Sequence, residues 1–208
     1  MDTNRITGLA LAISPVAAIV IWFIMGFVLL GGVGPDDPKT YTAELGANST
    51  AVKYLFPFVT LLFLIAVGGL GYIKKSMEGG SGSYIAGFAW FLILLGAAGQ
   101  LGEVAFTLAL AEAAHDANWA VASSMFAGGQ AIGAVTTAFS FLGFALFGFA
   151  IWQQKNFSPA LAGLMFVAGI YTLIMCLVDY ESLLVAIGYI GIVVSFAWLG
   201  IGLLNKKD

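Results

Sequence analysis

The chain has 208 residues, of which 61% are hydrophobic and only 9% charged, and its formal net charge is −3. Soluble domains carry about a quarter of charged residues, so this composition excludes a soluble globule and predicts a membrane protein. The apolar runs are continuous and do not alternate with polar residues, which favours membrane-spanning helices over strands.

Six apolar runs are long enough to cross a bilayer, for which a helix needs about 20 residues. They cover residues 6–30, 53–73, 84–111, 119–152, 160–178 and 183–204. The predicted fold is all-α: one six-helix transmembrane domain over residues 1–208, arranged as three hairpins. Pro15 lies inside the first run, where Ser14 can satisfy the backbone that a proline leaves free, so we expect a kink and not a break.

A weak internal repeat supports the three hairpins. The first, third and fifth runs open with ITGL, IAGF and LAGL, which carry Gly8, Gly87 and Gly163. The even-numbered runs end with similar glycine-rich segments that lead into lysines. In a chain with 27 glycines, chance similarity and duplication both remain open.

The basic residues predict the orientation, because lysine and arginine are enriched in cytoplasmic loops. With the N terminus inside, only Lys39 and Lys53 fall on the external side. The cytoplasmic side then holds Arg5, Lys74, Lys75, Lys155, Lys206 and Lys207. Both termini are therefore predicted to be cytoplasmic.

Two loops differ in character. The external segment 33–51 is long and rich in turn-forming residues, and it contains Asn48-Ser49-Thr50, an acceptor pattern for N-glycosylation. The internal segment KKSMEGGSGS is typical of a flexible linker.

Polar residues inside the third and fourth runs form the main candidate site. Gln100, Glu103 and Thr107 lie on one helix face, and Gln130 and Thr137 are seven residues apart on the next helix. Folding the two runs about Asp116 places Glu103 level with Gln130. A carboxylate in hydrocarbon must be protonated, hydrogen-bonded or hydrated. Two interpretations remain: a Glu103–Gln130 helix clamp, or a proton or cation site that opens outward.

A weaker candidate lies at the external end of the third run. Glu112, His115 and Asp116 share a helix face and are the residue types that bind a divalent metal, but a solvated helix end explains them more simply. We therefore predict no metal site.

Other signatures of chemistry are missing. The chain has one histidine and one cysteine, Cys176, which lies within an apolar run. Haem-attachment and dinucleotide patterns do not occur, so we expect no cofactor and no enzyme activity. Basic clusters of the kind that bind nucleic acid are also missing.

The last third of the chain resembles a prokaryotic family of small six-span integral membrane proteins of unknown function. The similar elements are the glycine-rich run from Phe139, the turn Ser158-Pro159, the helix start Leu161-Ala162-Gly163, and Trp198-Leu199 in the last run. The resemblance implies a plasma-membrane location and no assigned chemistry.

Three functional classes follow. The leading hypothesis is a non-catalytic subunit or scaffold of a membrane assembly, in contact with lipid and with other membrane protein chains or further copies of itself. The alternative is a small transporter or channel with an outward-facing polar site around Glu103 and Gln130. An intramembrane enzyme that uses Glu112, His115 and Asp116 ranks last.

Overall fold

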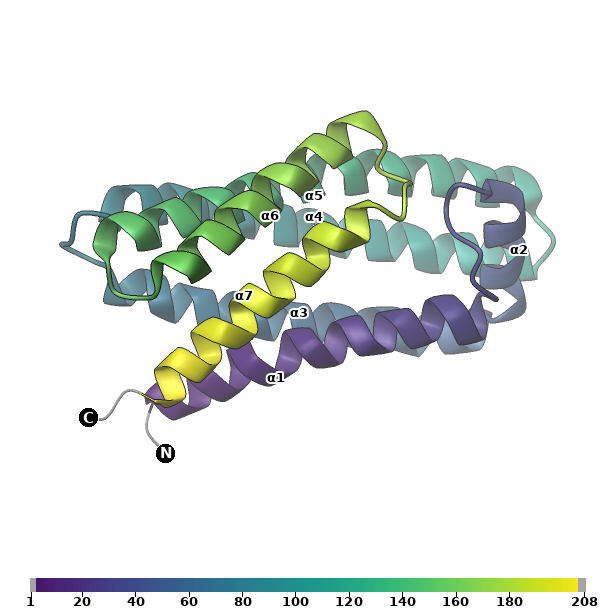
Figure 1. Ribbon diagram of the computed structural model, residues 1–208. Coiled ribbons are helices and arrows are strands. Elements are labelled where there is room, and N and C mark those ends of the chain that lie inside the picture. The colour runs from purple at the N-terminus through teal and green to yellow at the C-terminus, as the bar shows by residue number, and fades with distance from the viewer. Residues whose placement is uncertain (1–2, 206–208) are drawn as a thin grey trace.

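A computed structural model describes residues 3–205, and within this range the chain is entirely helical apart from turns. Figure 1 shows the helices as a bundle with both ends of the chain at one end. The elements in order are α1 (Thr3–Ile24), η1 (Met25–Leu29), α2 (Pro38–Ala47), α3 (Ser49–Ser76), α4 (Ser83–His115), α5 (Trp119–Gln154), α6 (Pro159–Val178) and α7 (Val185–Leu204).

Six of these helices are long and apolar enough to cross a membrane, which confirms the all-α, multi-pass prediction. Contacts join consecutive spans and also link α7 back to α1, so the spans form a ring of neighbours. Their division into three hairpins and the side of the membrane that each end faces stay predictions. We call the two ends of the bundle the terminal end, where the N and C termini lie, and the α2 end.

The first helix continues through its proline without a break, as expected, and the expected kink stays a prediction. Pro15 is buried within α1, and the hydroxyl of the preceding Ser14 donates a hydrogen bond to the carbonyl of Ala10. The helix then widens into a π-helical turn, η1, where Leu30 N donates to Met25 O at 3.0 Å. Such turns are local irregularities that often mark functional sites.

The long loop predicted over 33–51 is wrong in part, because it contains α2 and the start of α3. Asp37 caps α2 by accepting a hydrogen bond from Thr40 N at 3.3 Å, and Pro38 occupies the first turn, where its missing N–H costs nothing. These local signals outweigh the turn-forming composition.

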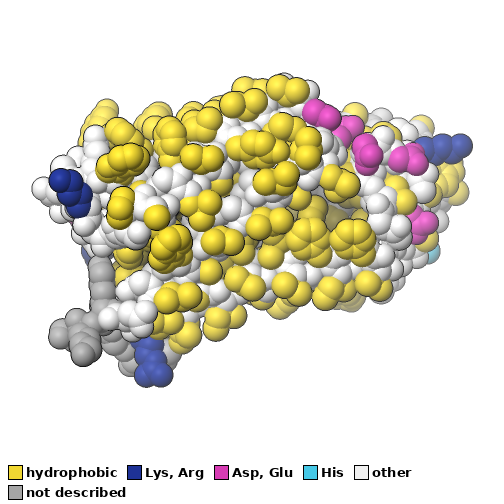
Figure 2. Space-filling model, in the orientation of Figure 1, with side chains coloured by type: hydrophobic (Ala, Val, Ile, Leu, Met, Phe, Trp, Pro, Cys, Tyr) yellow, Lys and Arg dark blue, Asp and Glu magenta, His cyan; other side chains and the backbone are white. Residues whose placement is uncertain are grey.

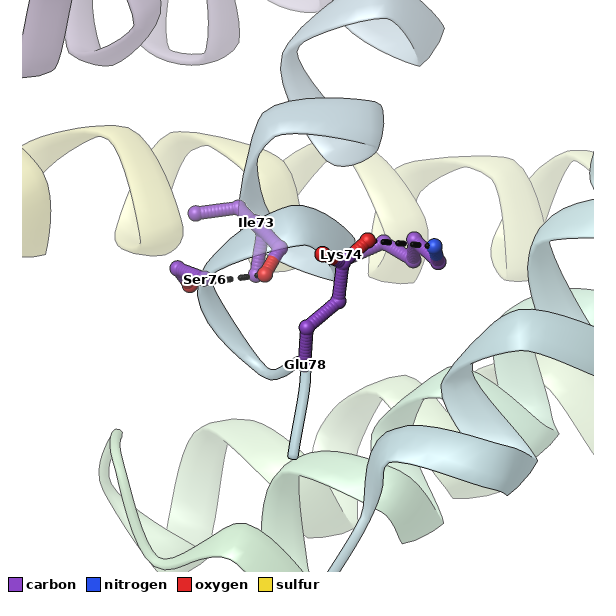
Figure 3. A network of polar contacts seen from close by, with 4 residues as sticks. All are labelled: Ile73, Lys74, Ser76 and Glu78. Carbon is purple, nitrogen blue, oxygen red and sulfur yellow. Dashed lines mark hydrogen bonds and ion pairs between the residues drawn. The ribbon is translucent and has the colours of Figure 1, made fainter. Parts of the chain in front are cut away.

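The predicted flexible linker is short and held in place. Lys74 Nζ contacts Glu78 Oε1 at 2.8 Å and Ser76 Oγ donates to Ile73 O at 2.7 Å, so that polar contacts close the end of α3 (Figure 3). The hydrogen bond from Lys74 keeps the pKa of Glu78 below its ordinary value. Gln154 Oε1 also accepts from Gly82 N at 3.0 Å, which ties the turn to α5.

Acidic side chains concentrate at one end of the bundle. In Figure 2, Asp and Glu side chains gather near the α2 end, where a basic side chain is also visible, and hydrophobic side chains cover the visible face between the two ends. Arg5, Lys74, Lys75 and Lys155 belong to the elements of the terminal end. The predicted orientation therefore places the α2 end outside.

Two apolar clusters frame the interior. The larger lies toward the terminal end and includes Leu70, Ile93 and Phe147, which are fully buried. The smaller lies at the α2 end and includes Leu45, Val52 and Leu110. The polar residues of the third and fourth spans lie between these clusters.

Candidate ligand-binding cavity

A cavity of about 290 Å³ lies inside the bundle, between the two apolar clusters. Residues of α1, α2, α3, α4, α5 and α7 line it, together with the segment 180–183 between α6 and α7. Cavities of a few hundred Å³ that are mostly apolar with a few convergent polar groups are the usual sites of small ligands. The predicted polar residues Gln100, Glu103, Thr107 and Gln130 are all on its wall.

Glu103 is the acidic group at the centre of this wall. Its Oε1 accepts a hydrogen bond from the hydroxyl of Tyr180 at 3.0 Å, and its backbone carbonyl accepts from Thr107 Oγ1 at 3.0 Å. Across the helix pair, the carboxyl group lies against Gly133 of α5, where a Cβ would come within 2.7 Å of Glu103 Cδ. Because Gly133 has no side chain, the carboxyl group of Glu103 has room to lie against α5.

The Glu103–Gln130 hydrogen bond of the predicted clamp does not form between these two described residues. The reason is the tilt of helical side chains toward the N terminus of their own helix. Because α4 and α5 are antiparallel, Glu103 tilts toward the terminal end and Gln130 toward the α2 end. The carboxyl therefore meets Gly133, one turn away from the predicted level.

Gln130 keeps an unused hydrogen-bonding group. Its Oε1 atom is buried and has no hydrogen-bond partner, although the side chain borders the cavity. Buried polar atoms are rarely left unpaired, and a ligand or water in the adjoining cavity is the ordinary explanation of an exception.

Thr137 differs from the other predicted residues, because it is fully buried and lies behind the wall. Its Oγ1 is 3.4 Å from the hydroxyl oxygens of both Tyr180 and Tyr189. Thr137, the two tyrosines and Glu103 therefore make one connected polar group.

The sequence interpretation missed both tyrosines. Tyr180 has the position of an interfacial anchor, yet the turn between α6 and α7 folds it back over the cavity, where it is half-buried. Burial and the neighbouring Glu103 raise the pKa of Tyr180 well above its ordinary value. Its phenol therefore stays protonated and keeps its role as a donor.

Aromatic rings close the cavity toward the terminal end. Phe141, Phe144 and Phe196 are at most 1% exposed and line the cavity. Edge-to-face contacts join Phe144 to Phe141 at 5.5 Å and to Phe196 at 5.4 Å between ring centroids. This packed floor offers no continuous polar path through the bundle, which argues against an open channel.

Helix α2 covers the opposite side of the cavity. Tyr41 and Leu45 of α2 line the cavity, and the Tyr41 ring meets Phe126 edge-on at 6.2 Å. Burial raises the pKa of Tyr41 to about 12.

Asn48, after the end of α2, donates from Nδ2 to Leu29 O at 2.9 Å and to Glu44 O at 3.0 Å. These bonds fasten α2 to the end of the first span. They also engage the amide nitrogen to which a glycan would be attached in the predicted acceptor pattern.

Between α1 and α7 the cavity has a lateral side. The two helices touch near the terminal end, where a Cβ on Gly200 would lie 2.5 Å from Gly8 O, and they spread toward the α2 end (Figure 1). Residues from the spread halves, among them Trp22 and Ala186, line the cavity. Figure 2 shows this face hollowed between the two helices, next to the acidic side chains.

The weaker candidate, Glu112, His115 and Asp116, lies at the exposed end of α4. Within the described range, no group of three such side chains is arranged to hold a metal ion. No protein-family model, curated protein or solved structure matches the chain.

Proposed function

We propose that the protein is a non-catalytic, multi-pass protein of the plasma membrane that binds a small, largely apolar molecule carrying one polar group. The observation that supports this is the cavity with Glu103 on its wall and the unpaired Gln130 Oε1 beside it. A carboxyl group beside an internal cavity carries a desolvation cost that an amide making the same hydrogen bond avoids, which favours a binding role over a purely structural one.

The packed aromatic floor and the α2 cover favour binding from the external side over free conduction. In a transport cycle, the conformation described here would be the one that receives the ligand, and the aromatic floor of the cavity would open in a second conformation. The transporter alternative is compatible with this arrangement, whereas the channel alternative lacks a continuous path through the bundle.

Accessibility of the cavity tests the proposal. We would replace the single cysteine by Cys176→Ala, introduce Thr107→Cys on the cavity wall, and follow reaction with neutral 2-hydroxyethyl methanethiosulfonate added outside. Ala89→Cys in the closed core is the control, because Ala89 is fully buried away from the cavity. We expect the Thr107→Cys variant to react at least tenfold faster than the control. Equal rates would contradict an accessible cavity.

A role as a subunit of a larger assembly, or as a homo-oligomer, is the second candidate. Four glycines have no atom within 4 Å of the position that a Cβ would take, so the backbone is open to the outside there: Gly26, Gly68, Gly87 and Gly163. Small residues of this kind let membrane helices of two chains approach closely. Native mass spectrometry of the particle from its own membrane tests this candidate, and a lone monomer would contradict it.

A further inference from the structure

The charged groups of the cavity wall have one sign. Glu103 lies deep and Glu181 lies in the segment between α6 and α7, while no described residue of the wall is lysine, arginine or histidine. At low dielectric constant, like charges repel strongly and basic groups would be needed to hold an anion. This wall therefore disfavours anionic ligands.

Among the residues that the structure describes, none forms an ion pair with Glu103. The ion pair found among the described residues joins Lys74 and Glu78, at the terminal end. Tyr180 supplies a hydrogen bond to Oε1, and no hydrogen bond between described residues ends on Oε2. Oε2 therefore faces the cavity without a partner among these residues, and a positive charge on a ligand would stabilise the carboxylate there.

The rest of the wall suits the apolar part of a cation. It includes the aromatic rings of Trp22, Tyr41, Phe126 and Tyr189. Aromatic faces attract cations, and quaternary ammonium groups are often held by several rings together. A cavity of about 290 Å³ accommodates one aromatic ring with a small ammonium group.

We infer that the ligand is a lipophilic organic cation, whose positive charge lies against Glu103 and whose apolar part lies among the aromatic rings. The inference rests on the proposed function and names the chemical class of its ligand. The hollow between α1 and α7 gives such a molecule a route from the lipid, and the acidic side chains at the α2 end attract it from water.

Two probes of equal shape and different charge test the inference. Phenyltrimethylammonium is a cation that cannot donate a conventional hydrogen bond, and tert-butylbenzene is its neutral isostere. Binding of each to the full chain in lipid nanodiscs would be measured by calorimetry, with empty nanodiscs subtracted. For wild type, we expect saturable binding of the cation. For Glu103→Gln, we expect at least a tenfold weaker cation affinity and an unchanged affinity for the isostere.

Glu112→Gln is the matched control, because it removes the same charge from the exposed end of α4, outside the cavity wall, and we expect less than a threefold effect. If Glu103→Gln does not fold, Tyr180→Phe replaces it: this variant keeps the carboxyl group and removes its hydrogen bond, so cation binding should persist.

The possible failures are distinguishable. Unchanged cation affinity in Glu103→Gln would overturn the inference. If the isostere binds wild type, is excluded by Ala186→Phe, and the cation does not bind, the inference fails and the proposed function stands. If neither probe binds and the Thr107→Cys variant is inert, both fail.

Discussion

The hydroxyl of Tyr180 donates to Glu103 Oε1 at 3.0 Å, which joins the turn before α7 to the middle of α4. The two residues are 77 positions apart in the sequence. This bond holds the only acidic side chain deep in the cavity wall in a fixed place, at the point where α5 has a glycine.

We expect Tyr180→Phe to lower the free energy of unfolding by about 0.6–2 kcal/mol, the range of hydrogen bonds between membrane helices. Glu103→Gln should cost less, because an amide oxygen still accepts from the phenol. Unfolding in mixed micelles measures both variants and their combination. An unchanged free energy of unfolding in Tyr180→Phe would show that the bond contributes nothing, whereas additive effects in the double variant would show that the phenol bonds an amide oxygen as strongly as a carboxyl oxygen.

A glycine series distinguishes contacts with a movable side chain from contacts with backbone. A Cβ at position 133 meets the end of the Glu103 side chain at 2.7 Å, whereas at position 143 it meets Ala89 O at 2.9 Å. Because a side chain moves more easily than a helix, we expect Gly133→Ala to cost about 1 kcal/mol and Gly143→Ala up to about 3 kcal/mol.

Gly163→Ala is the control of this series, since nothing lies within 4 Å of its Cβ position, and its stability should be unchanged or slightly higher. The same unfolding measurement applies to all three variants. A cost for Gly163→Ala as large as that for Gly143→Ala would contradict the packing argument.

The six spans could be predicted from the sequence because continuous hydropathy depends on composition alone. The spacing of small polar groups also predicted a site of Gln100, Glu103, Thr107, Gln130 and Thr137; the first four line the cavity, and Thr137 lies behind its wall. Helical periodicity assigns residues to a face and therefore works without knowledge of the partner helix.

The partner of Glu103 could not be predicted in the same way. Its identity depends on the opposite tilt of side chains on antiparallel helices and on a turn that carries Tyr180 back over the bundle. The cavity itself follows from how α1 and α7 spread away from Gly8 and Gly200, a property of packing that no local pattern contains. The missed α2 is different, because Asp37-Pro38 is a local capping signal that predicts a helix start.

Alkaline pH should weaken the α2 cover through Tyr41. Burial raises the pKa of Tyr41 to about 12, from an ordinary value of 10.0. Between these values the unfolded chain loses the proton and the folded protein keeps it, so stability is complete below pH 10 and falls as the pH rises toward 12. Two units correspond to at most about 2.7 kcal/mol.

Unfolding in detergent at a series of pH values measures this effect. In Tyr41→Phe, part of the fall between pH 10 and 12 should disappear, and the remainder is expected from Tyr180, whose pKa is also raised. An identical fall in wild type and variant would show that Tyr41 is not buried when the protein is folded.

The fastening of α2 gives the last prediction. Asn48→Ala removes the two hydrogen bonds from Nδ2 to Leu29 O and Glu44 O, each of which contributes about 0.5–1.5 kcal/mol. We expect α2 to separate more often from the end of the first span, which exposes the cavity from the α2 end. Amide hydrogen exchange in α2 should therefore become at least fivefold faster, and the Thr107→Cys variant that also carries Asn48→Ala should react faster with the external reagent.

Thr50→Ala is the matched control, because it destroys the same Asn-Ser-Thr acceptor pattern at an exposed position and leaves the Asn48 amide intact. Equal effects of the two substitutions would mean that the position of α2 depends on the acceptor pattern and not on the hydrogen bonds. An effect of Asn48→Ala alone would show that the hydrogen bonds of this amide hold α2 over the cavity.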